Sequence, residues 1–272
     1  MRRIALACVL LLAASSPAFA TWSVIALDQQ TGQVVIASAT CVPQASFANF
    51  PAKGLMDVQA IIVPGKGVAA AQAGVDRTRA NQKLVFAEIQ KGTEPTQIIE
   101  LLKADPNIES RQFGILDLQG RGAGFSGQKN NAASLDRRDH VDGTGIYVSV
   151  QGNILASDEV VTSAIDAFKQ AKGTLSDRVM AAMEAADAKG GDKRCTCDSE
   201  PKVNAPCEAK TAHVAYIVAA DKTDRSGESF NDGTYAMFVN VTDADITPAE
   251  NANPVKTLRM RYDAWKRSHS GR

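Results

Sequence analysis

Short β-strand segments occur in groups along this 272-residue chain, and pairs of helical segments separate the groups. Each expected strand is rich in Val, Ile, Ala or aromatic residues and is bounded by residues that favour turns. The expected strands cover residues 21–27, 34–39, 58–63, 68–73, 112–117, 123–126, 145–150, 212–219 and 235–241. Because strands follow strands within each group, antiparallel sheets are favoured over alternating βαβ units.

Between these groups, apolar residues recur at helical spacing. The expected helices cover residues 76–91 and 93–103, begin at Ser157 and Thr174, and cover 254–265. Residues 221–233 are polar and contain glycine, so they are expected to form an exposed loop. We expect an α+β fold in which two antiparallel sheets stack face to face and a helical layer covers the outside of each, a four-layer αββα sandwich.

The first twenty residues have the pattern of a secretory signal peptide. Two arginines precede an apolar segment over 4–14, and residues 18–20, Ala-Phe-Ala, fit the small-x-small rule for cleavage. A membrane anchor is less favoured, because a helix needs about 20 apolar residues to span a bilayer. Cleavage would leave a single domain over 21–272 that begins at Thr21 and works in the periplasm or outside the cell.

The charge of the chain gives no argument for a nucleic-acid partner. Lys+Arg and Asp+Glu are equal, at 30 each. Such a balance does not favour binding to nucleic acid or to an anionic membrane surface. We therefore expect a small-molecule or peptide substrate, no nucleic-acid partner and no stable membrane anchor, while a homo-oligomer is left open.

Four cysteines remain after the predicted cleavage, at Cys41, Cys195, Cys197 and Cys207. An even number in an exported chain favours disulfides, with three possible connectivities. Cys195 and Cys197 are too close to pair with each other, so we expect one to bond Cys207 and the other Cys41. Zinc bound by Cys195, Cys197, Cys207 and His213 is the alternative, but Cys-x-Cys spacing and an oxidising compartment favour disulfides, so no metal or cofactor is expected.

The usual catalytic signatures are absent from the sequence. There is no GxGxxG before a helix, no P-loop, no HExxH and no GxSxG. The histidines that follow the predicted signal, His140, His213 and His269, stand far apart, which gives little support to a histidine-dependent triad. Thr21 needs no histidine, because a free N-terminal threonine carries a hydroxyl nucleophile and an α-amine with a pKa of about 7.7–8.0 as its base.

Several stretches of the chain resemble one bacterial family. They are Thr21-Trp-Ser-Val-Ile-Ala-Leu-Asp28, Gly67-Val-Ala-Ala-Ala-Gln72-Ala73, Arg111-Gln112-Phe-Gly114-Ile-Leu-Asp117, Phe125-Ser-Gly127, Ser149-Val-Gln151-Gly152-Asn153-Ile-Leu155, Gly190-Gly-Asp192-Lys-Arg194 and Asn253-Pro-Val-Lys-Thr-Leu258. Together they resemble the family catalogued as domain of unknown function 1028, over nearly the whole of 21–272. The resemblance implies an Ntn-hydrolase-like αββα sandwich, and it implies a fold more strongly than an activity.

One segment departs from the family pattern, and a second extends the domain at its C-terminal end. A cysteine-containing insertion at about 195–210 follows the Gly-Gly-Asp-x-Arg stretch, where family members usually run straight on. A strand and a helix at about 234–268 form a C-terminal extension of the domain. The insertion could reshape one wall of any pocket.

In the N-terminal-nucleophile hypothesis, the partners of Thr21 are polar residues at the ends of core strands. Asn153 or Gln72 would hold the oxyanion, because an amide N–H can donate to it. The candidate substrate-binding residues are Ser38, Thr40, Gln151, Asp192 and Arg194. Two alternatives stay open: 151–153 could simply form a turn, and Asp192 with Arg194 could only finish a helix.

Two function classes follow from this sequence. The first is an N-terminal-threonine amidohydrolase acting on an amide or peptide, such as a fragment derived from the cell wall. The second is a non-catalytic envelope or secreted binding protein on the same fold. A free Thr21 amine favours the first class, and a blocked or extended N-terminus favours the second.

Overall fold

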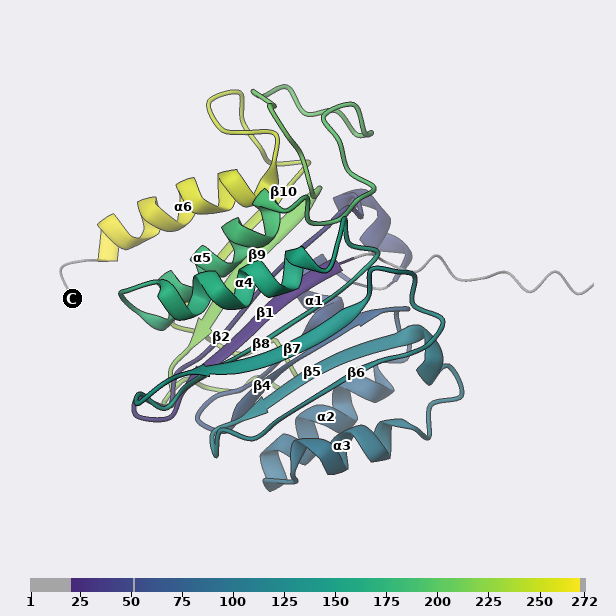
Figure 1. Ribbon diagram of the computed structural model, residues 1–272, viewed down its shortest axis with the longest axis vertical. Helices are drawn as coiled ribbons and strands as arrows, with labels where there is room; N and C mark the ends of the chain where they lie inside the picture. The colour runs from purple at the N-terminus through teal and green to yellow at the C-terminus, as the bar shows by residue number, and fades with distance from the viewer. Residues whose placement is uncertain (1–20, 51, 270–272) are drawn as a thin grey trace, which may run out of the picture.

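The computed structural model describes residues 21–50 and 52–269 as a mixed α+β protein with two antiparallel sheets (Figure 1). The six-stranded sheet contains β1 (Thr21–Asp28), β2 (Val34–Thr40), β7 (Leu135–Val141), β8 (Ile146–Asn153), β9 (Val214–Ala220) and β10 (Met237–Thr242). Its order is β10-β9-β2-β1-β8-β7. The four-stranded sheet contains β3 (Ala60–Val63), β4 (Gly67–Ala73), β5 (Arg111–Asp117) and β6 (Gly122–Ser126), in chain order. The predicted signal peptide, residues 1–20, lies outside the described residues.

Helices cover the outer face of each sheet. The helices are α1 (Leu55–Gln59), α2 (Ala80–Lys91), α3 (Pro95–Leu102), α4 (Glu159–Gln170), α5 (Leu175–Ala188) and α6 (Pro254–His269), with short 3₁₀ turns η1 (Gln44–Asn49) and η2 (Ile108–Ser110). Figure 1 shows α4, α5 and α6 on one side of the strands and α2 and α3 on the other. The same division appears in the core, where one apolar cluster packs beneath each helical layer and a third lies between the sheets. The layers therefore run helix, sheet, sheet, helix.

Strand β1 is buried on both faces near the centre of its sheet. Every second residue, including Trp22, packs toward the helices. The alternate residues Ile25 and Leu27 belong to the cluster between the sheets. Since side chains alternate across a strand, Thr21 and Ser23 point the same way. The space between the sheets is therefore apolar near Leu27 and polar near Thr21.

Two disulfides fasten the cysteine-containing loop. Cys41, which directly follows β2, bonds Cys195, and Cys197 bonds Cys207 at a sequence separation of 10. The prediction that Cys195 and Cys197 bond one each to Cys41 and Cys207 is confirmed, and the structure supplies the pairing. The first disulfide holds the loop against the end of β2, and the second closes the loop on itself.

Several segments differ from the sequence prediction, among them the following three. The predicted strand over 58–63 begins only at Ala60, because the preceding residues form α1. Strand β7 has no predicted counterpart, because Leu-Asp-Arg-Arg-Asp-His-Val carries the charges that an edge strand exposes. The segment 221–233, predicted to be exposed, buries Phe230 and Asn231. Asn231 Nδ2 donates to Ala60 O across 3.1 Å, which holds this segment against β3.

The predicted C-terminal strand and helix belong to the six-stranded sheet and to the helical layer that covers it. β10 pairs antiparallel with β9, and β9 pairs with β2. α6 packs on both of these late strands. The strands that carry Thr21 and its neighbours are therefore central and covered on both faces.

Candidate functional site

Thr21 is the first residue of β1 and lies between β2 and β8. The register places Thr21 opposite Thr40 on one side and opposite Asn153 on the other. Residues directly opposite each other in an antiparallel pair point to the same face of the sheet. Thr21 Oγ1 donates to Thr40 Oγ1 across 3.2 Å, and both side chains are buried. Three side chains predicted to belong to the site thus converge at one end of the six-stranded sheet.

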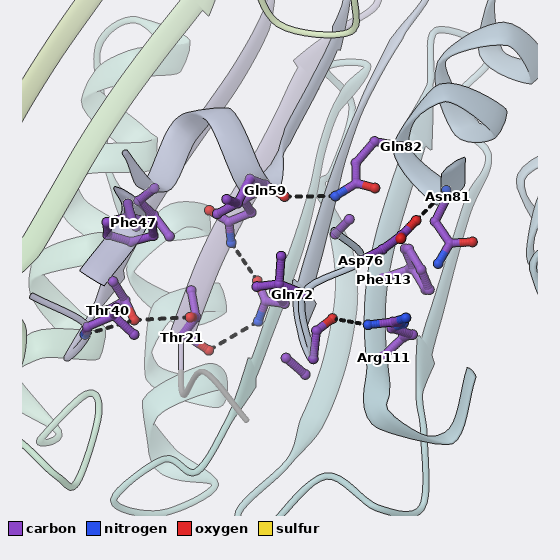
Figure 2. A pocket seen from close by; sticks show the side chains of 17 residues that line it. Thr21, Thr40, Phe47, Gln59, Gln72, Asp76, Asn81, Gln82, Arg111 and Phe113 are labelled. Carbon is purple, nitrogen blue, oxygen red and sulfur yellow. Dashed lines mark hydrogen bonds between the residues drawn. The ribbon is translucent and has the colours of Figure 1, made fainter. Parts of the chain in front are cut away.

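Gln72, near the end of β4, links the second sheet to Thr21. Its Nε2 donates to Thr21 O across 3.1 Å and to Gln112 Oε1 across 2.7 Å. Its Oε1 accepts hydrogen bonds from Ser23 Oγ and Gln59 Nε2, each at 2.7 Å. Figure 2 shows the contacts of Gln72 with Thr21 and Gln59. Both polar atoms of this amide are therefore engaged within the protein.

Two further glutamines extend the polar layer between the sheets. Gln112 Nε2 donates to Gly152 O across 2.9 Å, and Gln151 Nε2 donates to Ser23 Oγ. Gly114 on β5 leaves the space that Gln151 fills, since a Cβ at that position would collide with the Gln151 amide. This layer fixes the spacing of the two sheets beside Thr21. A fully partnered buried network of this kind specifies a single arrangement of its members.

A cavity of about 20 Å³ adjoins Thr21, which is room for one water molecule. Its polar wall is formed by side chains that the network holds, among them Thr40, Gln59 and Gln72. Its apolar wall contains Val42, Phe47, Leu55, Val58 and Phe113. Most of these apolar residues come from the segment between β2 and β3 that contains η1 and α1 (Figure 2).

Two residues beside the site have unusual backbone geometry. Ala73, directly after Gln72, has φ 66°, and Ile154, directly after Asn153, has φ 55°. A residue with a Cβ rarely adopts this left-handed region, and the strain is typically about 1–3 kcal/mol. Such strain tends to cluster at functional sites. Here it follows both amides that the sequence analysis proposes for the oxyanion.

Asp76 and Arg111 also line the cavity, to the right of Gln72 in Figure 2. Burial alone would raise the pKa of Asp76, but hydrogen bonds from Asn81 and Thr78 outweigh it, and the pKa lies below its ordinary value. The Asp76 carboxylate therefore stays ionised at neutral pH. Arg111 Nε donates to Asp105 Oδ2 across 2.8 Å, so its charge is paired. These residues brace the chain around the cavity.

Asp192 and Arg194 form an ion pair, with 2.7 Å between Arg194 Nη2 and Asp192 Oδ2. Asp192 is fully buried. Its Oδ2 also accepts from the Cys41 backbone N–H across 2.9 Å. The carboxylate therefore ties the loop after α5 to the residue that follows Thr40.

The structure brings together only part of the predicted site. The cavity wall includes Thr21, Thr40 and Gln72. As far as the structure describes it, the wall contains none of the other predicted site residues, which are Ser38, Gln151, Asn153, Asp192 and Arg194. Ser38 instead donates from Oγ to Trp22 O across 2.6 Å, which fastens β2 to β1.

Gln59 and Gln112, which were not predicted from the sequence, complete the polar layer. Gln59 ends the unpredicted helix α1, and Tyr216 Oη donates to its Oε1 across 3.0 Å. Gln112 lies near the start of β5, at 0% exposure. A glutamine inside an otherwise apolar strand was the available signal for Gln112, because a buried amide requires several partners.

A model of the family of unknown function DUF1028 matches residues 21–201, which is more than half of the chain. The chain belongs to the DUF1028 family. No curated protein matches this DUF1028 chain. Its fold is similar to that in the crystal structure of a DUF1028 protein from Silicibacter pomeroyi, with a TM-score of 0.63 and 19% sequence identity.

That similarity covers 91% of this DUF1028 chain and 89% of the Silicibacter pomeroyi chain. Residues 1–201 together make up less than 91% of the chain. The similarity to the solved structure therefore also includes residues beyond 201, where the match to the family model ends. At this identity the likeness shows the fold alone. Within residues 21–50 and 52–269, no helix has both the length and the apolar composition needed to cross a bilayer.

Proposed function

We propose that this DUF1028 protein is an N-terminal-nucleophile hydrolase of amide bonds, with Thr21 as nucleophile once residues 1–20 are removed. The observation that carries the proposal is the position of Thr21, first on a central strand with its hydroxyl on a cavity wall beside Thr40. In this proposal the fold is an Ntn-hydrolase-like αββα sandwich. The protein works in the periplasm or outside the cell, where its disulfides persist.

The freed α-amine of Thr21 acts as the base. It takes the proton of Oγ1 as Oγ1 bonds to the carbonyl carbon of the substrate amide. Asn153, opposite Thr21 on β8, donates its amide N–H to the oxyanion that forms. The C–N bond then breaks, and the leaving amine receives the proton held by the α-amine. A water deprotonated by the same α-amine hydrolyses the ester and restores Oγ1.

Gln72 orients the nucleophile without touching the substrate. Its hydrogen bond to Thr21 O fixes the backbone of the residue that reacts. Thr40 Oγ1, 3.2 Å from Thr21 Oγ1, holds that oxygen at the cavity wall. Preorganisation of this kind supplies catalysis because the reacting groups need no reorganisation during the reaction.

The apolar wall of the cavity favours a substrate with an apolar group beside its scissile amide. Phe47, Leu55, Val58 and Phe113 offer no charged group to that part of the substrate. A peptide or amide fragment derived from the cell wall fits the proposed compartment. No bound cofactor enters this mechanism, because the hydroxyl and the amine belong to the same residue.

The direct test measures hydrolysis of acyl amides, peptides and muropeptides by the chain that begins at Thr21. Thr21→Ala is expected to abolish turnover, and Thr21→Ser is expected to retain part of it. Activity should rise as pH passes the pKa of the α-amine, because only the neutral amine accepts the proton. An activity that Thr21→Ala leaves intact would contradict the proposal.

The second candidate function is a non-catalytic envelope or secreted binding protein. The burial of Thr21, which is only 2% exposed, favours it, since a nucleophile must be open to its substrate. A compound that raises the thermal midpoint equally in the unmodified chain and in Thr21→Ala, without being hydrolysed, would support this function instead.

A further inference from the structure

A second cluster of reactive side chains lies just beyond the end of β2. One ligand atom each from Cys41, Cys195 and His213 lies within 4.8 Å of the other two. Cys41 follows directly on Thr40, and His213 precedes β9 by one residue. The His213 backbone N–H donates to Thr40 O across 2.7 Å. Two neighbouring strands therefore hold the imidazole against the Cys41–Cys195 disulfide.

His213 keeps one ring nitrogen without a partner. Its side chain is only 2% exposed, and Nδ1 has no hydrogen bond. The ring is hydrogen-bonded to the Glu200 backbone, and this contact falls to Nε2 because Nδ1 has none. Metal-binding histidines have this arrangement, with one nitrogen fixed to a carbonyl and the other facing the ion.

The electrostatic surroundings keep the imidazole in its metal-binding form. Burial, together with the charges of Lys210 and Arg194, lowers the pKa of His213 to about 4. The ring is therefore neutral at neutral pH, as a metal ligand must be.

Asp243 presents a second unpartnered atom to this cluster. Its Oδ2 has no hydrogen bond and lies 3.7 Å from His213 Nδ1, too far for a hydrogen bond. Its Oδ1 accepts from the Gln44 backbone N–H across 3.0 Å, which holds the carboxylate in place. Burial raises the pKa of Asp243 above its ordinary value. Two buried polar atoms thus face each other unsatisfied, and such groups call for an explanation.

We infer that Cys41, Cys195 and His213 bind a zinc ion when the Cys41–Cys195 disulfide is reduced, with Asp243, whose Oδ2 lies 3.7 Å from His213 Nδ1, as the ligand for the fourth position. Tetrahedral zinc places its sulfur and nitrogen ligand atoms about 3.3–3.8 Å apart. Atoms already within 4.8 Å reach that spacing by movements of about 1 Å, which side-chain rotations supply. The inference stands independently of the proposed hydrolase function.

The two states exchange by thiol chemistry. A dithiol reductant breaks the Cys41–Cys195 bond, gives two electrons and two protons to the sulfurs, and is itself oxidised to a cyclic disulfide. Zn²⁺ then displaces the two thiol protons to solvent as both thiolates bind. A disulfide oxidant reverses the sequence: it takes two electrons from the two thiolates and two protons from solvent, is itself reduced to two thiols, and Zn²⁺ is released as the Cys41–Cys195 bond re-forms.

Co²⁺ is the probe, because a tetrahedral cobalt site with thiolate ligands gives visible ligand-field bands and near-ultraviolet charge-transfer absorption. The test uses the chain that begins at Thr21, and therefore lacks Cys8, with Cys197→Ser and Cys207→Ser, so that only Cys41 and Cys195 contribute thiolates. We expect one equivalent of Co²⁺ with both signals after reduction, displaced by Zn²⁺, and neither signal from the oxidised chain. His213→Gln should weaken binding at least tenfold, whereas His140→Gln, at an exposed position, should not.

Retention of folding is checked by near-ultraviolet circular dichroism of each reduced sample. If the double serine variant unfolds, the unmodified chain is reduced at both disulfides, and the same two histidine variants are compared. A folded, reduced chain without these bands overturns the inference. Bands of equal strength and affinity in His213→Gln overturn it as well.

Discussion

Gln72 on β4 donates from Nε2 to the backbone carbonyl of Thr21 on β1 across 3.1 Å. Gln72 belongs to the four-stranded sheet and Thr21 to the six-stranded sheet. The candidate nucleophile is thus positioned by a side chain from the opposing sheet, and the packing of the two sheets sets its geometry. Because the same amide also bonds Ser23, Gln59 and Gln112, its removal should affect stability as well as activity.

Gln72→Leu should destabilise the fold by about 3 kcal/mol, because it leaves buried donors and acceptors between the sheets without hydrogen-bond partners. Denaturant unfolding, with the slope m unchanged, measures this loss. Gln119→Ala is the matched control, because residue 119 is exposed and should change stability by less than about 0.5 kcal/mol. Equal stability of Gln72→Leu and the unmodified chain would contradict the role assigned to this network.

The disulfide pairing should appear directly in peptide mapping without reduction. We expect one linked peptide pair joining Cys41 to Cys195 and another joining Cys197 to Cys207. Removing the second pair by Cys197→Ser with Cys207→Ser should lower the free energy of unfolding by about 2–3 kcal/mol, the usual value for a loop of this length. A link from Cys41 to Cys207 would show that the loop is held differently.

His213 should make stability depend on pH between neutrality and pH 5. Its pKa in the folded state is about 4, against 6.5 for the ordinary side chain. As pH falls through 6.5 the unfolded chain gains a proton that the folded chain does not take up, so the folded state loses stability until the pH reaches about 4. From pH 7 to pH 5 the loss should be about 2 kcal/mol.

The measurement for this titration is denaturant unfolding at pH 7, 6 and 5. His213→Gln should flatten the pH dependence even where it lowers stability at every pH. His140→Gln is the control, since the His140 side chain is 54% exposed. Equal slopes in the unmodified chain and in His213→Gln would show that His213 is not buried as a neutral ring.

The regular elements of the fold were predictable because their periodicity is strong. The hairpin of β1 and β2 follows from an alternating Val- and Ile-rich run around Thr31-Gly32. The helix predicted to begin at Thr174 does begin there, with Thr174 as N-cap in a capping box with Asp177. By contrast, the residues around Phe47 contain Pro43 and no clear period, so η1 and α1 escaped prediction.

The meeting of glutamines from both sheets in one polar layer was harder to predict from the sequence. Gln72 and Gln151 each stand out as an amide in an apolar strand, but the strands that carry them lie in different sheets. Their meeting depends on how the two sheets stack, which no local pattern encodes. Gln59 gave no such signal, because it ends the helix α1, which the sequence pattern does not predict.

Asn153 is the residue to which our mechanism assigns the oxyanion. Asn153→Ala should lower kcat by ~10²–10³ while leaving KM nearly unchanged, because the contact forms only as charge develops on the substrate oxygen. Steady-state kinetics on the hydrolysed amide measure both constants. A rise in KM with kcat unchanged would assign Asn153 to substrate binding instead.

The most direct test of the central claim is intact-mass and peptide analysis of the folded chain that begins at Thr21, after reaction with an epoxyketone. This electrophile condenses with a hydroxyl and an adjacent amine, which only an N-terminal serine or threonine offers together. We predict one adduct per chain, mapped to Thr21, also formed by Thr21→Ser and lost in Thr21→Ala or when Ala20 is retained. The absence of an adduct on the folded chain, or an equal adduct on Thr21→Ala, would contradict the account.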